Sequence, residues 1–172
     1  MMRLLALDQN NVTGGAVGDA GGSPLFWSWR LPAGKDGDNG PRFAALYDHV
    51  CGAIREHQPD RVIYETPFLK LRQRAQTTRL VMGYAAIVEA ACVACATPCC
   101  EATVQEWRRF LLSVVPKGSE AAKAATMAYC RRLGWQVRND HEGDACGLWF
   151  YGCSLFVPSL AARTGPLFQG AA

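Results

Sequence analysis

The chain has 172 residues, of which 49% are hydrophobic, and a formal net charge of +3 at pH 7. This length supports one domain with a sizeable core and excludes two ordinary domains. A small positive charge indicates nucleic-acid binding only weakly, because the distribution of basic residues matters more than their sum.

The first third of the chain predicts three antiparallel strands in hairpin succession. The apolar run Arg3–Asp8 is the first strand, and it ends on an acid. The glycines of Val12–Gly15 predict a tight turn into the second strand at residues 16–20, and the aromatic run Leu25–Leu31 predicts the third.

A crossover helix and a fourth strand follow. The loop Gly34–Pro41 precedes Arg42–His57, where apolar residues recur with the period of an amphipathic helix. Asp60–Glu65 is the next predicted strand, and like the first it ends on an acid.

The remaining predicted elements are a long helix at Gln73–Thr97, a strand at Cys99–Thr103, and helices at Val104–Val114, Glu120–Leu133 and Asp140–Phe156. This order predicts an α/β fold with a mixed sheet. We expect one domain over residues 1–157 and a flexible C-terminal tail over residues 158–172.

The eight cysteines do not predict disulfides, because the N-terminus lacks a signal-peptide cleavage site and the expected compartment is a reducing cytoplasm. Four cysteines have spacing that could supply a zinc site: Cys92, Cys95, Cys99 and Cys100. Their alanine-rich apolar setting predicts core cysteines instead, so we expect no structural zinc. The most apolar region carries Glu89 near its middle, so no membrane span is expected.

Two acids at strand ends and the first turn of the last predicted helix are expected to form one ligand-binding site. Asp8 and Glu65 end strands that would be neighbours, and ligands bind at the carboxyl ends of parallel strands. His141 and Asp144 are three residues apart, so they share a helix face that could pack there. The alternative is that Asp140 is an N-cap and that the acids after it only complement the helix dipole.

Several carboxylates brought together repel one another unless a cation lies among them. Oxygen-rich clusters with an imidazole suit Mg²⁺ or Mn²⁺. Two such ions roughly 4 Å apart stabilise the attacking and leaving oxygens of a phosphodiester displacement. The joint occurrence of these residues therefore predicts a metal-dependent nuclease.

Three segments carry a resemblance to a known family. LALDQNNVTGGAV, VIYETPF and NDHEGDACGLWFYG resemble the acidic motifs of the RuvC-type Holliday junction resolvases, in particular phage-borne members, within the ribonuclease H-like superfamily. The likeness extends from Leu4 to about Gly152. It implies a ribonuclease H-like fold: a five-stranded mixed sheet, with three antiparallel strands and then two parallel ones, flanked by helices.

The resemblance also implies site residues and cofactors. Two Mg²⁺ ions, replaceable by Mn²⁺, would be ligated by Asp8, Glu65, His141 and Asp144, with water attacking a phosphate to leave 5′-phosphate and 3′-hydroxyl ends. The lysine that helps to hold DNA in the family matches Lys123 best and Lys117 second. Gln9-Asn10 replaces the Pro-Gly that follows the first acid in bacterial members.

The expected partner is branched DNA, specifically a four-way junction. Basic residues and an exposed aromatic after Glu65 would contact it, namely Phe68, Lys70, Arg72 and Arg74. Pro67 disfavours helix there, so Phe68 is expected on a loop as a wedge between bases, the alternative being an ordinary buried hydrophobe. Paired nicks require a homodimer, with the small-residue face of Gln73–Thr97 as its interface. For a phage-encoded protein the location would be the cytoplasm of the bacterial host.

Three other functions remain open at this stage. The same fold and metal cluster serve nucleases that act on other branched DNA or on RNA. An actin-like nucleotide-binding module also has an Asp and a Thr-Gly turn in its first hairpin, but it needs two such domains. A DNA-binding protein without catalysis is the third alternative, and the intact set of acids argues against it.

Overall fold

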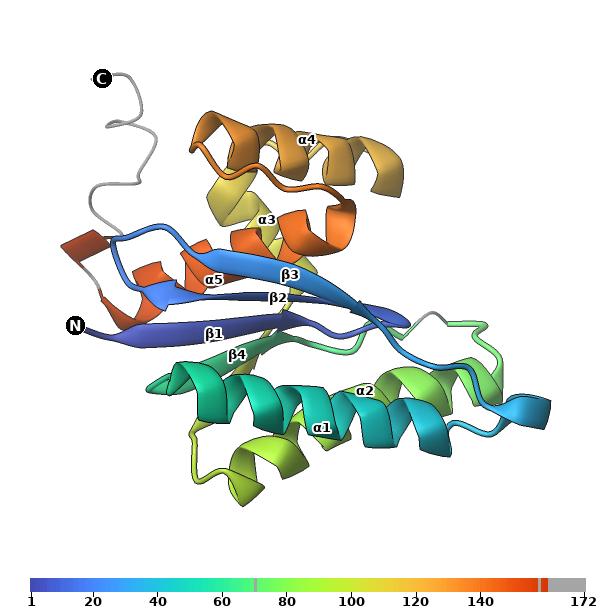
Figure 1. The fold of residues 1–172 in the computed structure, drawn as a ribbon. Helices are drawn as coiled ribbons and strands as arrows, with labels where there is room; N and C mark the ends of the chain where they lie inside the picture. The colour runs from blue at the N-terminus through green and yellow to red at the C-terminus, as the bar shows by residue number, and fades with distance from the viewer. Residues whose placement is uncertain (70, 158, 161–172) are drawn as a thin grey trace.

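The computed structural model describes residues 1–69, 71–157 and 159–160. One five-stranded sheet forms its centre, in the order β3-β2-β1-β4-β5 (Figure 1). Strands β1 (Arg3–Asp8), β2 (Val12–Asp19) and β3 (Leu25–Arg30) are antiparallel, whereas β4 (Arg61–Glu65) and β5 (Cys99–Ala102) run parallel to β1. The mixed sheet expected from the sequence is therefore confirmed.

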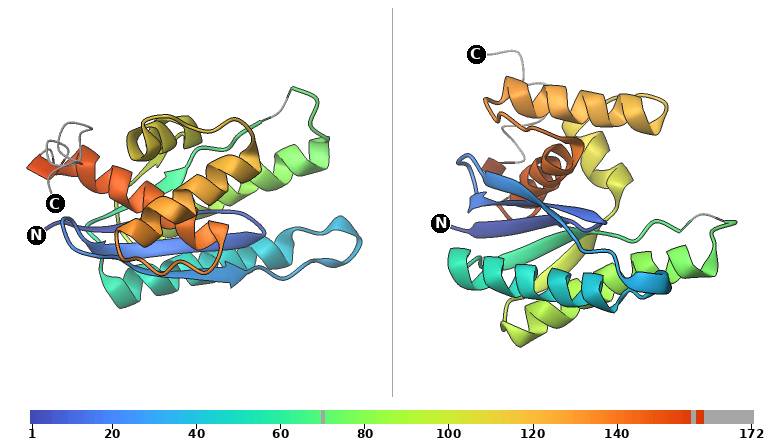
Figure 2. Two further views of the ribbon diagram at one scale, coloured as in Figure 1. Left: turned by 90° about the horizontal axis from the view of Figure 1, so that it is seen from above. Right: turned by 45° about the vertical axis from the view of Figure 1, so that its right-hand side comes forward.

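Helices cover both faces of the sheet (Figures 1 and 2). A short 3-10 turn, η1 (Lys35–Gly37), precedes α1 (Gly40–His57), which packs with α2 (Ala75–Ala94) on one face. The other face carries α3 (Val104–Leu112), α4 (Ser119–Arg132) and α5 (Asp140–Phe156).

The alternation of β1 divides the core into two clusters. Leu5 and Leu7 pack against α1 and α2, whereas Leu4 and Ala6 pack against α5. Successive side chains of a strand point to opposite faces, so Asp8 lies on the same face as α5. This alternation places Asp8 where α5 can reach it.

The tight turn predicted at Val12–Gly15 is wrong, because β2 begins at Val12 and both glycines are paired strand residues. Gly14 lies opposite Asp8, and a Cβ at Gly14 would stand 2.0 Å from the carbonyl oxygen of His141. The glycine therefore lets α5 approach the sheet. Glycine inside a strand weakens the strand, and it often marks a place where another segment of backbone approaches closely.

Helix α2 differs modestly from the prediction, since it begins at Ala75 and ends at Ala94. It is long and apolar enough to cross a membrane by length and composition alone, a property that core helices of soluble proteins share. Here it buries Tyr84, Val88 and Cys92 against its neighbours. The expectation that it spans no membrane stays a prediction.

The predicted tail, residues 158–172, lies almost entirely outside the described residues. Its flexibility and the boundary at residue 157 therefore stay predictions.

Candidate active site

Strands β1 and β4 bring the first two acids to one edge of the sheet. The strands are parallel neighbours, and Asp8 and Glu65 end them. Gln9 continues the contact beyond the paired residues: the Glu65 backbone N–H donates to Gln9 Oε1 at 3.2 Å, and Gln9 Nε2 donates to the Glu65 carbonyl. The Gln9 side chain thus sets the spacing of the two strand ends.

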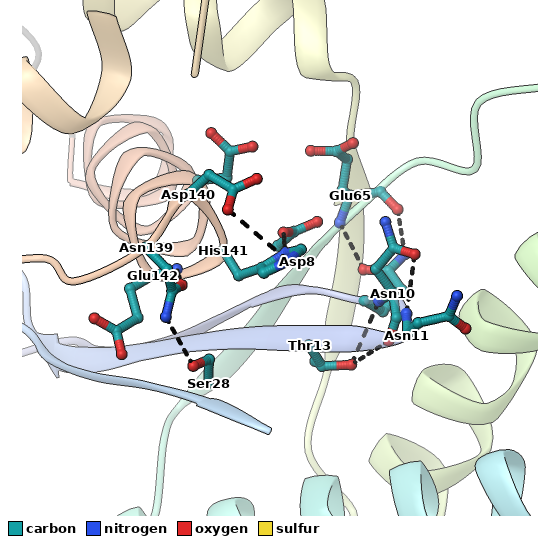
Figure 3. A network of polar contacts seen from close by, with 12 residues as sticks. Asp8, Asn10, Asn11, Thr13, Ser28, Glu65, Asn139, Asp140, His141 and Glu142 are labelled. Atoms are coloured by element: carbon teal, nitrogen blue, oxygen red, sulfur yellow. Dashed lines mark hydrogen bonds and ion pairs between the residues drawn. The ribbon is translucent and has the colours of Figure 1, made fainter. Parts of the chain in front are cut away.

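The first turn of α5 brings an imidazole to Asp8. His141 Nδ1 lies 3.3 Å from Asp8 Oδ2, and Figure 3 shows the two side chains together, with Glu65 on the neighbouring strand. The hydrogen bond with Asp8 raises the pKa of His141 above its ordinary value of 6.5. The close approach of α5 at Gly14 makes this contact possible.

Asp144, one turn further along α5, is held by an arginine. Its Oδ2 accepts from Arg108 Nη2 at 2.8 Å, and both side chains are largely buried. The other oxygen, Oδ1, is buried and has no hydrogen-bond partner within the described part of the chain. An unpaired buried carboxylate oxygen is costly, and a bound cation would satisfy it.

Helix α3 supplies two side chains to the site. Trp107 is fully buried and donates from Nε1 to Glu65 Oε2 at 3.3 Å, while the Arg108 guanidinium lies 4.9 Å from the centre of the Trp107 ring. A capping box between Thr103 and Glu106 fixes the start of this helix. Neither Trp107 nor Arg108 was predicted from the sequence to belong to the site.

The acids perturb one another strongly. Burial, and then the charges of Asp8 and Asp144, raise the pKa of Glu65 to about 8. Burial, and then the charge of Asp8, raise the pKa of Asp144 to about 7, although Arg108 opposes the change. Like charges forced together in a buried site are expected to retain protons until a cation replaces them.

No three His, Cys, Asp or Glu side chains are gathered as a complete metal-ligand group among residues 1–69, 71–157 and 159–160. The acids do not point at one another, because each contacts a different partner: Asp8 contacts His141, Glu65 contacts Trp107 and Asp144 contacts Arg108. Oxygen donors with one imidazole and an orphaned carboxylate oxygen nevertheless fit Mg²⁺ or Mn²⁺.

Lys123 reaches the rim of the site through an intermediate carboxylate. Its Nζ lies 2.7 Å from Asp140 Oδ2, and the opposite oxygen of Asp140 lies 4.0 Å from His141 Nε2. Lys117 is exposed on the loop between α3 and α4, and no ion pair joins it to an acid within the described part of the chain. The structure therefore favours Lys123 over Lys117 as the lysine beside the acids.

The alternative reading of the α5 start is partly wrong. The N-cap is Asn139, whose side chain accepts from the Glu142 backbone, rather than Asp140. Glu142 is fully buried and is bound by the backbone N–H and the guanidinium of Arg138. It is a structural acid, whereas His141 and Asp144 face the sheet edge.

The loop after Glu65 borders a crevice of about 150 Å³, whose lining includes Asp8, Glu65, Pro67 and Phe68. Phe68 lies outside helix and strand and is 58% exposed, so it is not an ordinary core residue. Arg72 and Arg74 are exposed on the same segment. Lys70 lies outside the described residues.

The chain is similar to known proteins in structure but not detectably in sequence. No family model and no curated protein sequence matches the chain.

Solved structures do match it. RuvC of Thermus thermophilus in complex with a Holliday junction substrate has a TM-score of 0.69 and 16% identity, over 96% of this chain and 97% of that one. A second structure of Thermus thermophilus RuvC has a TM-score of 0.66 and 15% identity, over 91% of this chain and 97% of that one. The yeast mitochondrial Holliday junction resolvase Ydc2 has a TM-score of 0.58 and 11% identity, over 94% of this chain and 84% of that one. The chain therefore has the ribonuclease H-like fold of the RuvC-type Holliday junction resolvases.

Proposed function

We propose that the chain is a divalent-metal-dependent endonuclease that resolves four-way DNA junctions. The observation that carries this proposal is the meeting of acids and an imidazole from β1, β4 and α5 at one sheet edge, namely Asp8, Glu65, His141 and Asp144. The likeness to a RuvC structure in complex with a Holliday junction substrate supports the substrate class.

The same four residues would hold two Mg²⁺ ions, or Mn²⁺ in their place. Bound there, the ions would stabilise the charge on the attacking and leaving oxygens of a phosphodiester displacement. The protein must first give up the protons that burial and mutual repulsion keep on Glu65 and Asp144. Arg108 holds Asp144 in place until then, and afterwards its guanidinium is available to a DNA phosphate.

The segment after β4 would contact the junction beside the crevice. Phe68 is exposed and borders that crevice, so it can stack on or wedge between bases. Arg72 and Arg74, exposed on the same segment, can hold phosphates. Lys123 would approach the DNA beside His141, where it already pairs with Asp140.

Symmetric resolution requires two active sites, so the functional unit would be a homodimer. Helix α2 is our candidate interface. It presents apolar side chains to solvent, with Met82 47% and Val93 80% exposed, and its small residues allow a second helix to approach closely.

The test is cleavage of a synthetic four-way junction with each strand labelled in turn. Wild type should nick opposed strands in Mg²⁺ and not in EDTA, and Asp8→Asn should bind without cleaving. Glu101→Gln, which removes an exposed charge on β5, is the matched control and should cleave normally.

Replication forks, flaps and RNA–DNA hybrids belong in the same assay. A faster reaction on one of these would identify a different ribonuclease H-like nuclease. Binding without cleavage of any substrate in Mg²⁺ or Mn²⁺ would contradict the proposal.

A further inference from the structure

A second pocket lies on the opposite face of the sheet from the acids, between the edge strand β3 and helix α1. Its volume is about 410 Å³, within the range of small-ligand pockets. Strand β3 contributes Trp27 and Trp29, and α1 contributes Asp48, His49, Gly52, Glu56 and His57. None of the proposed catalytic or DNA-binding residues lines it.

Aromatic rings form its walls. The Trp27 and Trp29 rings are 5.6 Å apart and inclined at 55°, so they present two faces rather than one flat surface. His49 stacks on Trp29 at 4.7 Å with an interplanar angle of 6°, and His57 lies 5.3 Å from Trp27. An indole face attracts a cation positioned within about 6 Å of its centre.

Two carboxylates add negative charge to this aromatic surface. Asp48 and Glu56 lie two helical turns apart, so they project from one face of α1. The Asp48 side chain has no ion pair or hydrogen bond within the described part of the chain, and the Glu56 side chain has only a contact of 4.0 Å with His57. A phosphate or carboxylate ligand would be repelled here, whereas a cation would be attracted.

Gly52 lies on α1 between the two carboxylates and is exposed. A glycine inside a helix costs about 1 kcal/mol relative to alanine. Packing does not require it, because nothing lies within 4 Å of a Cβ built there. The missing side chain instead leaves the pocket open between Asp48 and Glu56.

We propose that this pocket binds a small organic cation, an alkylammonium or guanidinium group held between Trp27, Trp29 and the two carboxylates. The group could belong to a free diamine or polyamine or to a Lys or Arg side chain, since both present the same chemistry. The proposal does not depend on the nuclease activity.

The test uses the ¹⁵N-labelled full chain and follows the indole N–H resonances, assigned with Trp27→Phe and Trp29→Phe. Agmatine, spermidine and N-acetyl-arginine amide are titrated, with butylurea as a neutral control of similar size. The Trp27 and Trp29 resonances should move with the cations, with a dissociation constant on the order of 1 mM. Tighter binding of agmatine or spermidine indicates a free cation, and tighter binding of N-acetyl-arginine amide indicates a protein side chain.

Three variants separate the pocket from general charge effects. Asp48→Asn and Glu56→Gln should each weaken binding about fivefold, and Gly52→Leu should abolish it by filling the pocket while α1 stays folded. Glu101→Gln removes the same charge on a distant strand and should bind as wild type does. The proposal is overturned if the two indole resonances do not move, if butylurea moves them equally, or if Gly52→Leu binds normally.

Discussion

Replacing Glu65 by glutamine should stabilise the metal-free protein at alkaline pH while abolishing cleavage. Burial and the neighbouring acids raise the pKa of Glu65 from its ordinary value of 4.5 to about 8. Between these two pH values the folded protein keeps a proton that the unfolded chain releases. The unfolding free energy of the wild type therefore falls as pH rises through this range.

The size of the effect follows from the same two values. Each pH unit in this range lowers the unfolding free energy by up to about 1.4 kcal/mol. Glutamine has no such proton, and its side-chain carbonyl can still accept the Trp107 N–H that Glu65 accepts at 3.3 Å. Glu65→Gln should be more stable than wild type by at least about 2 kcal/mol at pH 8 and by less than about 1 kcal/mol at pH 5.

Thermal unfolding in EDTA at the two pH values measures this difference. A gain of 2 kcal/mol corresponds to a rise in Tm of about 4–8 °C for a chain of this size. Adding Mg²⁺ at pH 8 should raise the Tm of the wild type more than that of the variant, because a charged ligand is lost and Mg²⁺ binds the variant more weakly. Glu101→Gln should behave as wild type in both respects. A variant that is less stable at pH 8, or that gains as much from Mg²⁺ as wild type, would refute the reasoning.

Three further variants test other parts of the site. Phe68→Ala should keep its Tm and lose at least about tenfold in the cleavage rate on an intact junction, with a smaller loss on a junction whose centre is unpaired; equal losses on both would exclude a wedge. Gln9→Met should require several-fold more Mg²⁺ for half-maximal cleavage with a similar maximal rate, since it loosens the Asp8–Glu65 spacing; an unchanged Mg²⁺ requirement would exclude this positioning role. His141→Ala should reduce cleavage severely but not completely, because water can replace one ligand of several; a wild-type rate would remove His141 from the site.

The elements that frame the site could be predicted from the sequence because local patterns decide them. The apolar run that ends at Asp8 and the helix Asp140–Phe156 have the same bounds in the structure as in the prediction. The expected order of the strands then predicted that the carboxylates of Asp8 and Asp144 and the imidazole of His141 lie close together. The error at Val12–Gly15 arose because glycines that admit a neighbouring helix look the same in sequence as glycines of a turn.

The partners of the acids could not be predicted, because they come from contacts between distant segments. Trp107 reaches Glu65 across 42 positions, and Arg108 reaches Asp144 across 36. No periodicity or spacing indicates such contacts, since they depend on how α3 packs against α5. The only local signal was the capping box that starts α3, and it fixes the helix rather than its partners.

The position of the metal is the most direct test of the account. Crystals of the wild-type protein grown with Mn²⁺ would locate the ions by anomalous scattering. We predict peaks beside Asp8, Glu65, His141 and Asp144, with Asp144 turned away from Arg108. Peaks confined to other residues, with the Arg108–Asp144 pair intact, would contradict the proposed active site.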